Sequence, residues 1–203
     1  DWGVAHPVLS VVMPCFNESA TIDTIVKRVL ESPYVRELII VDDGSTDGTR
    51  DQLQLLESDE RVWVQLQSVN QGKGAALRTG FSMATSPFVV VQDADLEYDP
   101  GAYRLLLEPL LSGQADVVFG SRFLTGRPRR VLFYWHSVGN HFLTVLSNMF
   151  SNLYLTDMET CYKAFRLEVV QGLELQENRF GIEPEMTAKV AAAHWKVWEV
   201  GIS

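Results

Sequence analysis

The chain has 203 residues, of which 46% are hydrophobic and 21% are charged, an ordinary composition for one soluble globular domain with a full core. Its formal net charge of -9 argues against nucleic acid as the main partner, because that partner usually requires a basic surface. Cys15 and Cys161 lie far apart and form no CxxC pair, which predicts isolated thiols of a reducing compartment. The first residues lack the pattern of a signal peptide and begin without methionine, so we expect a fragment or a processed chain.

Strand-like and helix-like segments alternate through the first half of the chain. Short apolar runs predict strands at residues 8–13, 37–41, 62–66, 88–91 and 115–119. Helices are expected over residues 22–30, 75–84 and 100–111. A further helix is expected to follow the turn-rich residues 42–48 and to end at about residue 56. Ser19 is expected to cap the helix over residues 22–30, and Asp99, followed by a proline, the helix over residues 100–111. This alternation predicts an α/β fold with a mostly parallel central sheet flanked by helices.

Polar clusters follow directly after four of the predicted strands. They are residues 14–18, 42–43, 93–97 and 120–122. In open α/β sheets, ligands bind outside the carboxyl ends of the strands. We therefore expect these four clusters to converge on one cleft.

The third cluster carries three acidic residues at alternate positions, Asp93, Asp95 and Glu97. Alternate residues of an extended chain point the same way, so these carboxylates are expected to share a face. A hard divalent ion with oxygen ligands, Mg²⁺ or Mn²⁺, would relieve their repulsion and bridge a diphosphate. The alternative is a solvated acidic turn.

Two further segments could contact a nucleotide. Asp42 and Asp43 could accept hydrogen bonds from a base or a ribose hydroxyl, although the following residues also suit a turn and helix cap. Lys73 lies between glycines in residues 70–74, which could approach a phosphate or pack beside the metal site. An ordinary glycine turn is the alternative there, since the spacing is not that of a P-loop.

Arg122 ends a strand and could hold a diphosphate by paired hydrogen bonds. It begins a basic stretch that continues with Arg127, Arg129 and Arg130. Residues 131–156 follow and contain no Asp, Glu, Lys or Arg. Uncharged polar residues recur there at helical spacing, which predicts a helix with a polar stripe and a large apolar face. Such a helix suits a bilayer surface, with the arginines at the headgroups, or else packs its apolar face on the core.

Two further segments contain acidic residues next to apolar ones, residues 157–161 and residues 180–185. Acids beside apolar residues, such as Asp157, are candidates for a general base or for acceptor binding. Glu185 follows Pro184, and its alternative role is at a helix terminus.

Seven segments, taken together and in this order, resemble family 2 glycosyltransferases, which have the GT-A fold, and more closely the dolichyl- and polyprenyl-phosphate sugar transferases. The segments are VVMPCFNES, LIIVDDGSTDGT, NQGKGAALRTGF, VVVQDADLEYDP, DVVFGSRF, DMETCYKAFR and FGIEPEMTAK, which span nearly the whole chain. The resemblance implies one GT-A catalytic domain over residues 1–203. Its nucleotide-binding half would be about residues 1–122 and its acceptor-side half residues 123–203.

The resemblance also implies roles for individual residues. The residues implied to bind the nucleotide sugar are Pro14, Asn17, Glu18, Asp42, Asp43, Lys73, Asp93, Ala94 and Arg122. The implied metal ligands are Asp93, Asp95 and Glu97, although relatives often carry glutamine at the last of these positions. Asp95, Arg122 and Asp157 would take part in catalysis, with Asp157 near the acceptor. Similar enzymes invert the anomeric centre in a single displacement.

Three functions stay open on the sequence alone. The first is transfer of a hexose from a GDP-mannose or UDP-glucose type donor to a lipid phosphate, on the cytoplasmic side of a membrane. The second is a family 2 transferase with a soluble sugar or glycan acceptor, and the third is a sugar-nucleotide-binding module without catalysis. Relatives continue beyond Ser203 with a basic loop and often with transmembrane segments, which we expect to be absent here.

Overall fold

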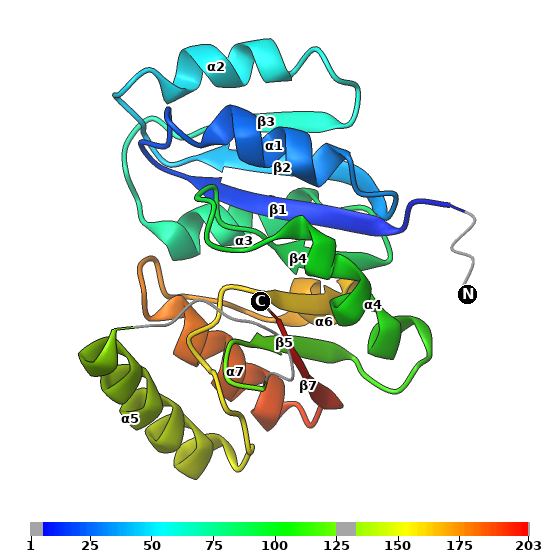
Figure 1. The fold of residues 1–203 in the computed structure, drawn as a ribbon, viewed down its shortest axis with the longest axis vertical. Coiled ribbons are helices and arrows are strands. Elements are labelled where there is room, and N and C mark those ends of the chain that lie inside the picture. Colours follow the sequence, from blue (N-terminus) through cyan, green and yellow to red (C-terminus); the bar gives the residue numbers. More distant parts are fainter. Residues whose placement is uncertain (1–5, 125–132, 203) are drawn as a thin grey trace.

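The computed structural model describes residues 6–124 and 133–202 (Figure 1). Within them, seven strands form one sheet in the order β3-β2-β1-β4-β6-β5-β7. The strands are β1 (Leu9–Cys15), β2 (Val35–Asp42), β3 (Val62–Leu66), β4 (Phe88–Val91), β5 (Val117–Ser121), β6 (Lys163–Arg166) and β7 (Val197–Gly201). Neighbouring strands are parallel except where β6 pairs with β4 and with β5. The predicted α/β fold with a mostly parallel sheet is therefore confirmed.

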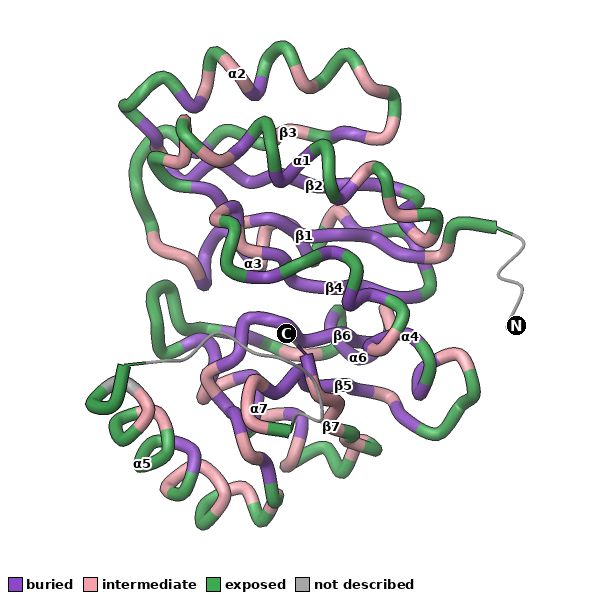
Figure 2. The backbone as a smooth tube through the Cα atoms, in the orientation of Figure 1, coloured by how far each residue is buried: buried purple, intermediate pink, exposed green. Residues whose placement is uncertain are grey.

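Helices lie on both sides of this sheet (Figure 1). In the described part of the chain they are α1 (Ile22–Leu30), α2 (Thr49–Leu56), α3 (Lys73–Met83), α4 (Tyr103–Leu111), α5 (Tyr134–Ser151), α6 (Leu167–Gly172) and α7 (Ile182–Ala192). A short 3-10 helix, η1 (Pro100–Ala102), leads directly into α4. Figure 2 shows the inner strands of the sheet as mostly buried, whereas many residues of α2 and α5 are exposed. Continuous apolar runs such as those of β1 and β4 are typical of strands covered on both faces.

The predicted elements agree with the structure in position but not always in their ends. Residues 62–66 and 88–91 are strands as predicted, whereas β1 continues past Met13 to Cys15. Asp99 caps η1 as expected, because its carboxylate accepts a hydrogen bond from the Gly101 amide at 3.0 Å. The expected Ser19 cap of α1 is wrong. The cap position is Thr21, and the amide of Ser19 instead donates to the Asp47 carboxylate at 3.1 Å.

The sheet topology brings the predicted polar clusters to one edge. β1, β2 and β4 are parallel, and β5 runs in the same direction because β6 lies antiparallel between β4 and β5. The residues that follow these four strands therefore lie at a common edge, as predicted. Since β6 runs the other way, its amino end and residues 157–162 reach the same edge.

Candidate functional site

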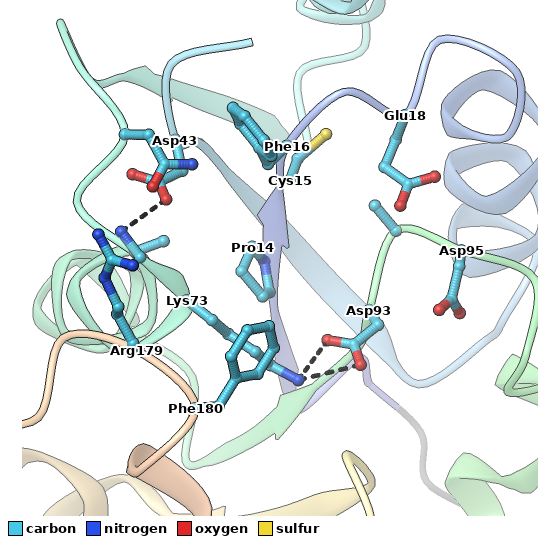
Figure 3. A pocket seen from close by; sticks show the side chains of 14 residues that line it. Pro14, Cys15, Phe16, Glu18, Asp43, Lys73, Asp93, Asp95, Arg179 and Phe180 are labelled. Atoms are coloured by element: carbon cyan, nitrogen blue, oxygen red, sulfur yellow. Dashed lines mark hydrogen bonds and ion pairs between the residues drawn. The ribbon is translucent and has the colours of Figure 1, made fainter.

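An open pocket with a volume of about 440 Å³ lies at this edge of the sheet. Its walls come from the carboxyl ends of β1, β2 and β4, from the start of α3 and from the segment before α7 (Figure 3). The lining residues are Pro14, Cys15, Phe16, Glu18, Asp43, Asn70, Gly72, Lys73, Ala76, Asp93, Ala94, Asp95, Arg179 and Phe180. The structure thus brings together the predicted residues Pro14, Glu18, Asp43, Lys73, Asp93, Ala94 and Asp95.

The three acidic residues after β4 have different partners. Asp93 is paired with the Lys73 ammonium group, at 2.8 and 3.0 Å from its two carboxylate oxygens. Glu97 lies 3.4 Å from the Arg122 guanidinium. Asp95 accepts a hydrogen bond from the Glu97 amide at 2.9 Å. Among the described residues, no three His, Cys, Asp or Glu side chains are grouped so that they could hold a metal ion. The three carboxylates therefore do not form the expected cluster, because basic side chains draw two of them aside.

Asp95 is the member of this trio best placed to receive a cation. Its pKa is raised from the ordinary value, first by desolvation and then by the negative charges of Asp93, Glu97 and Glu18, despite the amide hydrogen bond that lowers it. A divalent ion would remove this unfavourable environment. Asp93 and Asp95 both line the pocket, and Asp95 has no salt bridge within the described residues. Two such carboxylates fit a divalent ion whose other ligands are oxygens of the bound substrate and water.

Lys73 belongs to a line of alternating charges that runs from the pocket into the core. Its ammonium group lies 3.6 Å from the Glu183 carboxylate, and Glu183 is in turn paired with the fully buried Lys163. Lys163 also donates to the carbonyl oxygens of Met158, at 3.0 Å, and of Thr160. The line therefore ties α3, β4, α7 and the segment before β6 together beside the pocket.

The glycines around Lys73 serve a close contact between segments. A Cβ atom at Gly72 would lie 2.3 Å from the Asn178 carbonyl oxygen, and one at Gly74 would lie 2.2 Å from that of Glu177. The Gly74 and Ala75 amides donate to the Asn178 carbonyl at 2.8 and 3.2 Å. This carbonyl therefore occupies the amides at the start of α3, and the predicted approach of residues 70–74 to a phosphate stays a prediction. The Lys73 side chain does lie beside one acid of the predicted metal site, Asp93.

The same contact places two residues that sequence reasoning missed. Arg179 and Phe180 follow directly after residues 177–178 and line the pocket opposite β1 (Figure 3). Both are exposed, and the Phe180 side chain is 83% exposed. No spacing in the sequence pairs residue 179 with residue 72. The two glycines Gly72 and Gly74 do indicate that another segment packs closely against them, but the sequence does not show which segment this is.

The two aspartates at the end of β2 have separate roles. Asp42 is fully buried and holds the Arg50 guanidinium at 2.7 Å, and its predicted contact with a nucleotide stays a prediction. Asp43 lines the pocket and accepts the Gln71 and Gly72 amides, each at 2.7 Å. Asp42 therefore fixes the loop, and Asp43 faces the ligand space.

Cys15 and Asn17 lie at and just after the end of β1, and only Cys15 lines the pocket. The Asn17 side chain accepts the Thr46 amide at 2.9 Å and is not among the residues that line this pocket, so its implied role stays a prediction. Cys15 lines the pocket, but burial, followed by the charges of Asp42 and Glu18, raises its pKa to about 12. Its thiol therefore stays protonated. Both Cys15 and Cys161 are free and buried, as expected of isolated thiols.

The partly exposed Arg122 and the buried Asp157 form an ion pair outside this pocket. Asp157 is fully buried and accepts from Nε and Nη2 of Arg122 at 2.7 and 2.9 Å, and from the Asn140 amide group at 2.9 Å. Hydrogen bonding to Asp157 is the largest cause that raises the pKa of Arg122. Arg122 is thus not among the residues that line this pocket, and the predicted roles of Arg122 on phosphate and of Asp157 as a base stay predictions.

Helix α5 turns its polar stripe toward the domain. Asn148 exchanges hydrogen bonds with the backbone of Leu155 at 2.8 and 3.0 Å, and the Thr144 hydroxyl accepts the Met158 amide at 3.2 Å. Large apolar side chains point outward and are 40–88% exposed. These are Tyr134, Trp135, Val138, Phe142, Leu143, Val145, Met149 and Phe150. The alternative in which the apolar face packs on the core is therefore wrong.

Two related predictions concern a membrane. No helix in the described ranges, 6–124 and 133–202, is long and apolar enough to cross a bilayer. Arg127, Arg129 and Arg130, which were expected at the headgroups beside α5, lie outside the described residues.

Comparisons with known proteins place these features in a family context. The model of the family described as Glycosyl transferase family 2 matches residues 10–173. Glycosyltransferase AglJ of Haloferax volcanii is 31% identical over 182 residues, which are 89% of this chain and 57% of that protein. The dolichol-phosphate mannosyltransferase of Pyrococcus furiosus is 29% identical over 196 residues, 95% of this chain and 55% of that protein. The chain thus spans a little over half the length of these two relatives.

The fold is also found among solved structures. Glucosyl-3-phosphoglycerate synthase from Mycobacterium tuberculosis, in complex with Mn²⁺, uridine diphosphate and phosphoglyceric acid, aligns with a TM-score of 0.74. The alignment covers 97% of this chain and 69% of that one at 22% sequence identity. At this identity the likeness establishes a shared fold.

Proposed function

The chain belongs to glycosyl transferase family 2, and we propose that it is a metal-dependent, inverting glycosyltransferase. Its proposed donor is a nucleotide-diphosphate sugar of the GDP-mannose or UDP-glucose type. Its proposed acceptor is a polyprenyl or dolichyl phosphate. The observation that carries this proposal is the pocket in which Asp43, Asp93 and Asp95 converge from the ends of β2 and β4.

The pocket suits a donor of this class. Asp43 lies at one end, where a carboxylate can accept a base or ribose donor, and Asp93 and Asp95 lie at the other (Figure 3). Asp95, with Asp93 beside it, would hold the Mg²⁺ or Mn²⁺. When bound, the ion would stabilise the departing nucleotide diphosphate. The Mycobacterium tuberculosis structure that shares this fold contains Mn²⁺ and uridine diphosphate, which supports the same ligand class here.

The acceptor proposal rests on two features. The outward apolar face of α5 suits contact with a bilayer surface or a prenyl chain, at the same edge of the sheet as the pocket. An acceptor phosphate is already an anion and needs no strong general base, which agrees with Asp157 being buried and paired with Arg122. The name of the Pyrococcus furiosus relative, a dolichol-phosphate mannosyltransferase, points to the same acceptor class.

A soluble acceptor is the second candidate. It is favoured by the structural neighbour from Mycobacterium tuberculosis, which was solved with phosphoglyceric acid. A hydroxyl acceptor would require a carboxylate that can take its proton. Asp157, the expected candidate, would first have to leave Arg122, so the lipid phosphate is preferred.

Calorimetric titration with GDP-mannose, UDP-glucose and UDP-N-acetylglucosamine, each with Mn²⁺ and with a chelator, tests the donor. We expect one donor to bind with Mn²⁺ and to bind far more weakly with the chelator. Failure of all three to bind would contradict the proposal. Transfer of labelled sugar to polyprenyl phosphate in vesicles then tests the acceptor. Transfer to phosphoglyceric acid alone would favour the soluble acceptor, and binding with neither transfer nor hydrolysis would indicate a binding module.

A further inference from the structure

The charges that line the pocket are mostly negative. Glu18, Asp43, Asp93 and Asp95 all contribute carboxylates to its wall. The proposed donor carries a diphosphate, which adds more negative charge. A metal ion offsets part of this, and basic side chains that face the pocket must offset the rest.

Two of the three basic residues discussed at this edge are already committed to carboxylates. Lys73 holds both oxygens of Asp93, and its next neighbour is Glu183 at 3.6 Å. Arg122 is bound to the buried Asp157 and does not line the pocket. Neither can neutralise a bound diphosphate without breaking an ion pair.

Arg179 differs from both. It lines the pocket and is exposed, and in the part of the chain that the structure describes no hydrogen bond or ion pair holds its guanidinium. Figure 3 shows the side chain extending along the pocket wall toward Asp43. Among the described residues that line the pocket, the Arg179 guanidinium can therefore turn toward a ligand without breaking a hydrogen bond or an ion pair.

The backbone that carries Arg179 is fixed rather than left loose. The Asn178 carbonyl accepts the Gly74 and Ala75 amides, and Arg78 donates to the Glu177 carbonyl at 2.6 Å. The Arg179 stem packs over Gly72, where a Cβ atom would lie 2.8 Å from its Cγ. The base of the side chain is thus held at the rim, which limits the entropy that binding a ligand would cost.

We propose that Arg179 binds the diphosphate of the nucleotide-sugar donor and supplies the cationic side chain of the donor pocket. This inference rests on the proposed donor class. A guanidinium offers paired N–H donors that match phosphate oxygens. Because Arg122 is locked by Asp157, this assignment moves the phosphate contact from the end of β5 to the segment before α7.

The test compares three variants by calorimetry with UDP and GDP in the presence of Mn²⁺. Arg179→Gln removes the charge, and Arg179→Lys keeps the charge but loses the paired N–H donors of the guanidinium. The control, Arg28→Gln, makes the same charge change on the exposed face of α1. We expect Arg179→Gln to weaken binding of the preferred nucleotide by about tenfold or more, which is the usual scale for a charged hydrogen bond. Arg179→Lys should recover part of the loss, and Arg28→Gln should bind as the wild type does.

Uridine and guanosine separate the diphosphate from the base. The proposal predicts that Arg179→Gln leaves nucleoside binding unchanged and that its effect on the nucleotide shrinks at high salt. An affinity of Arg179→Gln for nucleotide within about twofold of the wild type would overturn the inference while leaving the proposed function intact. An equal loss for the nucleoside would overturn it by moving the contact to the base. If the wild type binds no nucleotide with Mn²⁺, the proposed function fails and the inference fails with it.

Discussion

At the scale of single residues, neighbouring acids of one motif take different roles because their partners differ. Asp93 is paired with Lys73, and Glu97 lies 3.4 Å from Arg122, so basic side chains offset only part of the repulsion expected among the three carboxylates. Asp95 is left in a partly desolvated place among acids, which raises its pKa. Of the three carboxylates, Asp95 would therefore be stabilised most by a bound divalent ion.

The Asp95→Asn variant tests this assignment. We expect Mn²⁺-dependent donor binding to weaken by more than tenfold, since the amide keeps the shape but loses the charge. The free energy of unfolding should change by less than about 1 kcal/mol, because removing a carboxylate whose pKa is raised also removes repulsion. Calorimetry and urea unfolding measure the two quantities. Glu97→Gln is the matched control and should bind metal nearly as the wild type does. Equal effects in both variants would contradict a special role for Asp95.

At the scale of elements, α5 shows where a local pattern is ambiguous. Its helical period and polar stripe are readable from the sequence. The usual rule that the apolar face meets the core fails here, because Asn140, Thr144 and Asn148 bind polar groups of residues 155–158. Those partners are backbone amides and carbonyls and a buried carboxylate, which a sequence pattern does not reveal. Whether the apolar face packs on the core therefore depended on contacts with residues outside the helix.

Replacing outward residues of α5 should separate membrane binding from folding. In a variant with both Phe142→Ser and Phe150→Ser, we expect binding to phospholipid vesicles to fall about tenfold or more, since each phenylalanine would bury apolar area in the bilayer. Stability should change little, because both side chains are exposed. Trp63→Ser, an exposed aromatic change on β3, is the control. Vesicle sedimentation measures the binding, and unchanged binding in the double variant would argue against a membrane role for this face.

At the scale of the whole molecule, the pocket joins segments far apart in the chain. Strand-end residues such as Asp43 and Asp93 could be placed from sequence, because apolar runs mark the strands and parallel order fixes the shared edge. Partners that the chain supplies from elsewhere could not be placed. Arg50 for Asp42, Glu183 for Lys73 and Asn178 for Gly74 become neighbours only through the tertiary fold. This is why Arg179 was not among the residues predicted to line the pocket.

The expected division into two halves is also a statement about the whole molecule, and it stays a prediction. The structure shows that the two ranges share one sheet, since β6 of residues 123–203 lies between β4 and β5 of residues 1–122. The donor pocket likewise takes Arg179 and Phe180 from the second range. A change at their junction should therefore alter donor binding even without touching the ligand.

Gly74→Ala tests that junction, since Gly74 does not line the pocket but meets the Glu177 carbonyl where a Cβ atom would lie at 2.2 Å. The carbonyl is backbone, so residues 177–180 must shift, and the overpacking should lower the free energy of unfolding by roughly 1–3 kcal/mol. The same shift displaces Arg179 and should weaken nucleotide binding several-fold under conditions where the variant is fully folded. Gly172→Ala, whose Cβ atom would meet nothing within 4 Å, should leave both quantities unchanged. If Gly74→Ala lowers the stability but binds nucleotide as the wild type does, donor binding does not depend on the contact between Gly74 and residues 177–180. Residues 1–122 would then be sufficient to form the donor site.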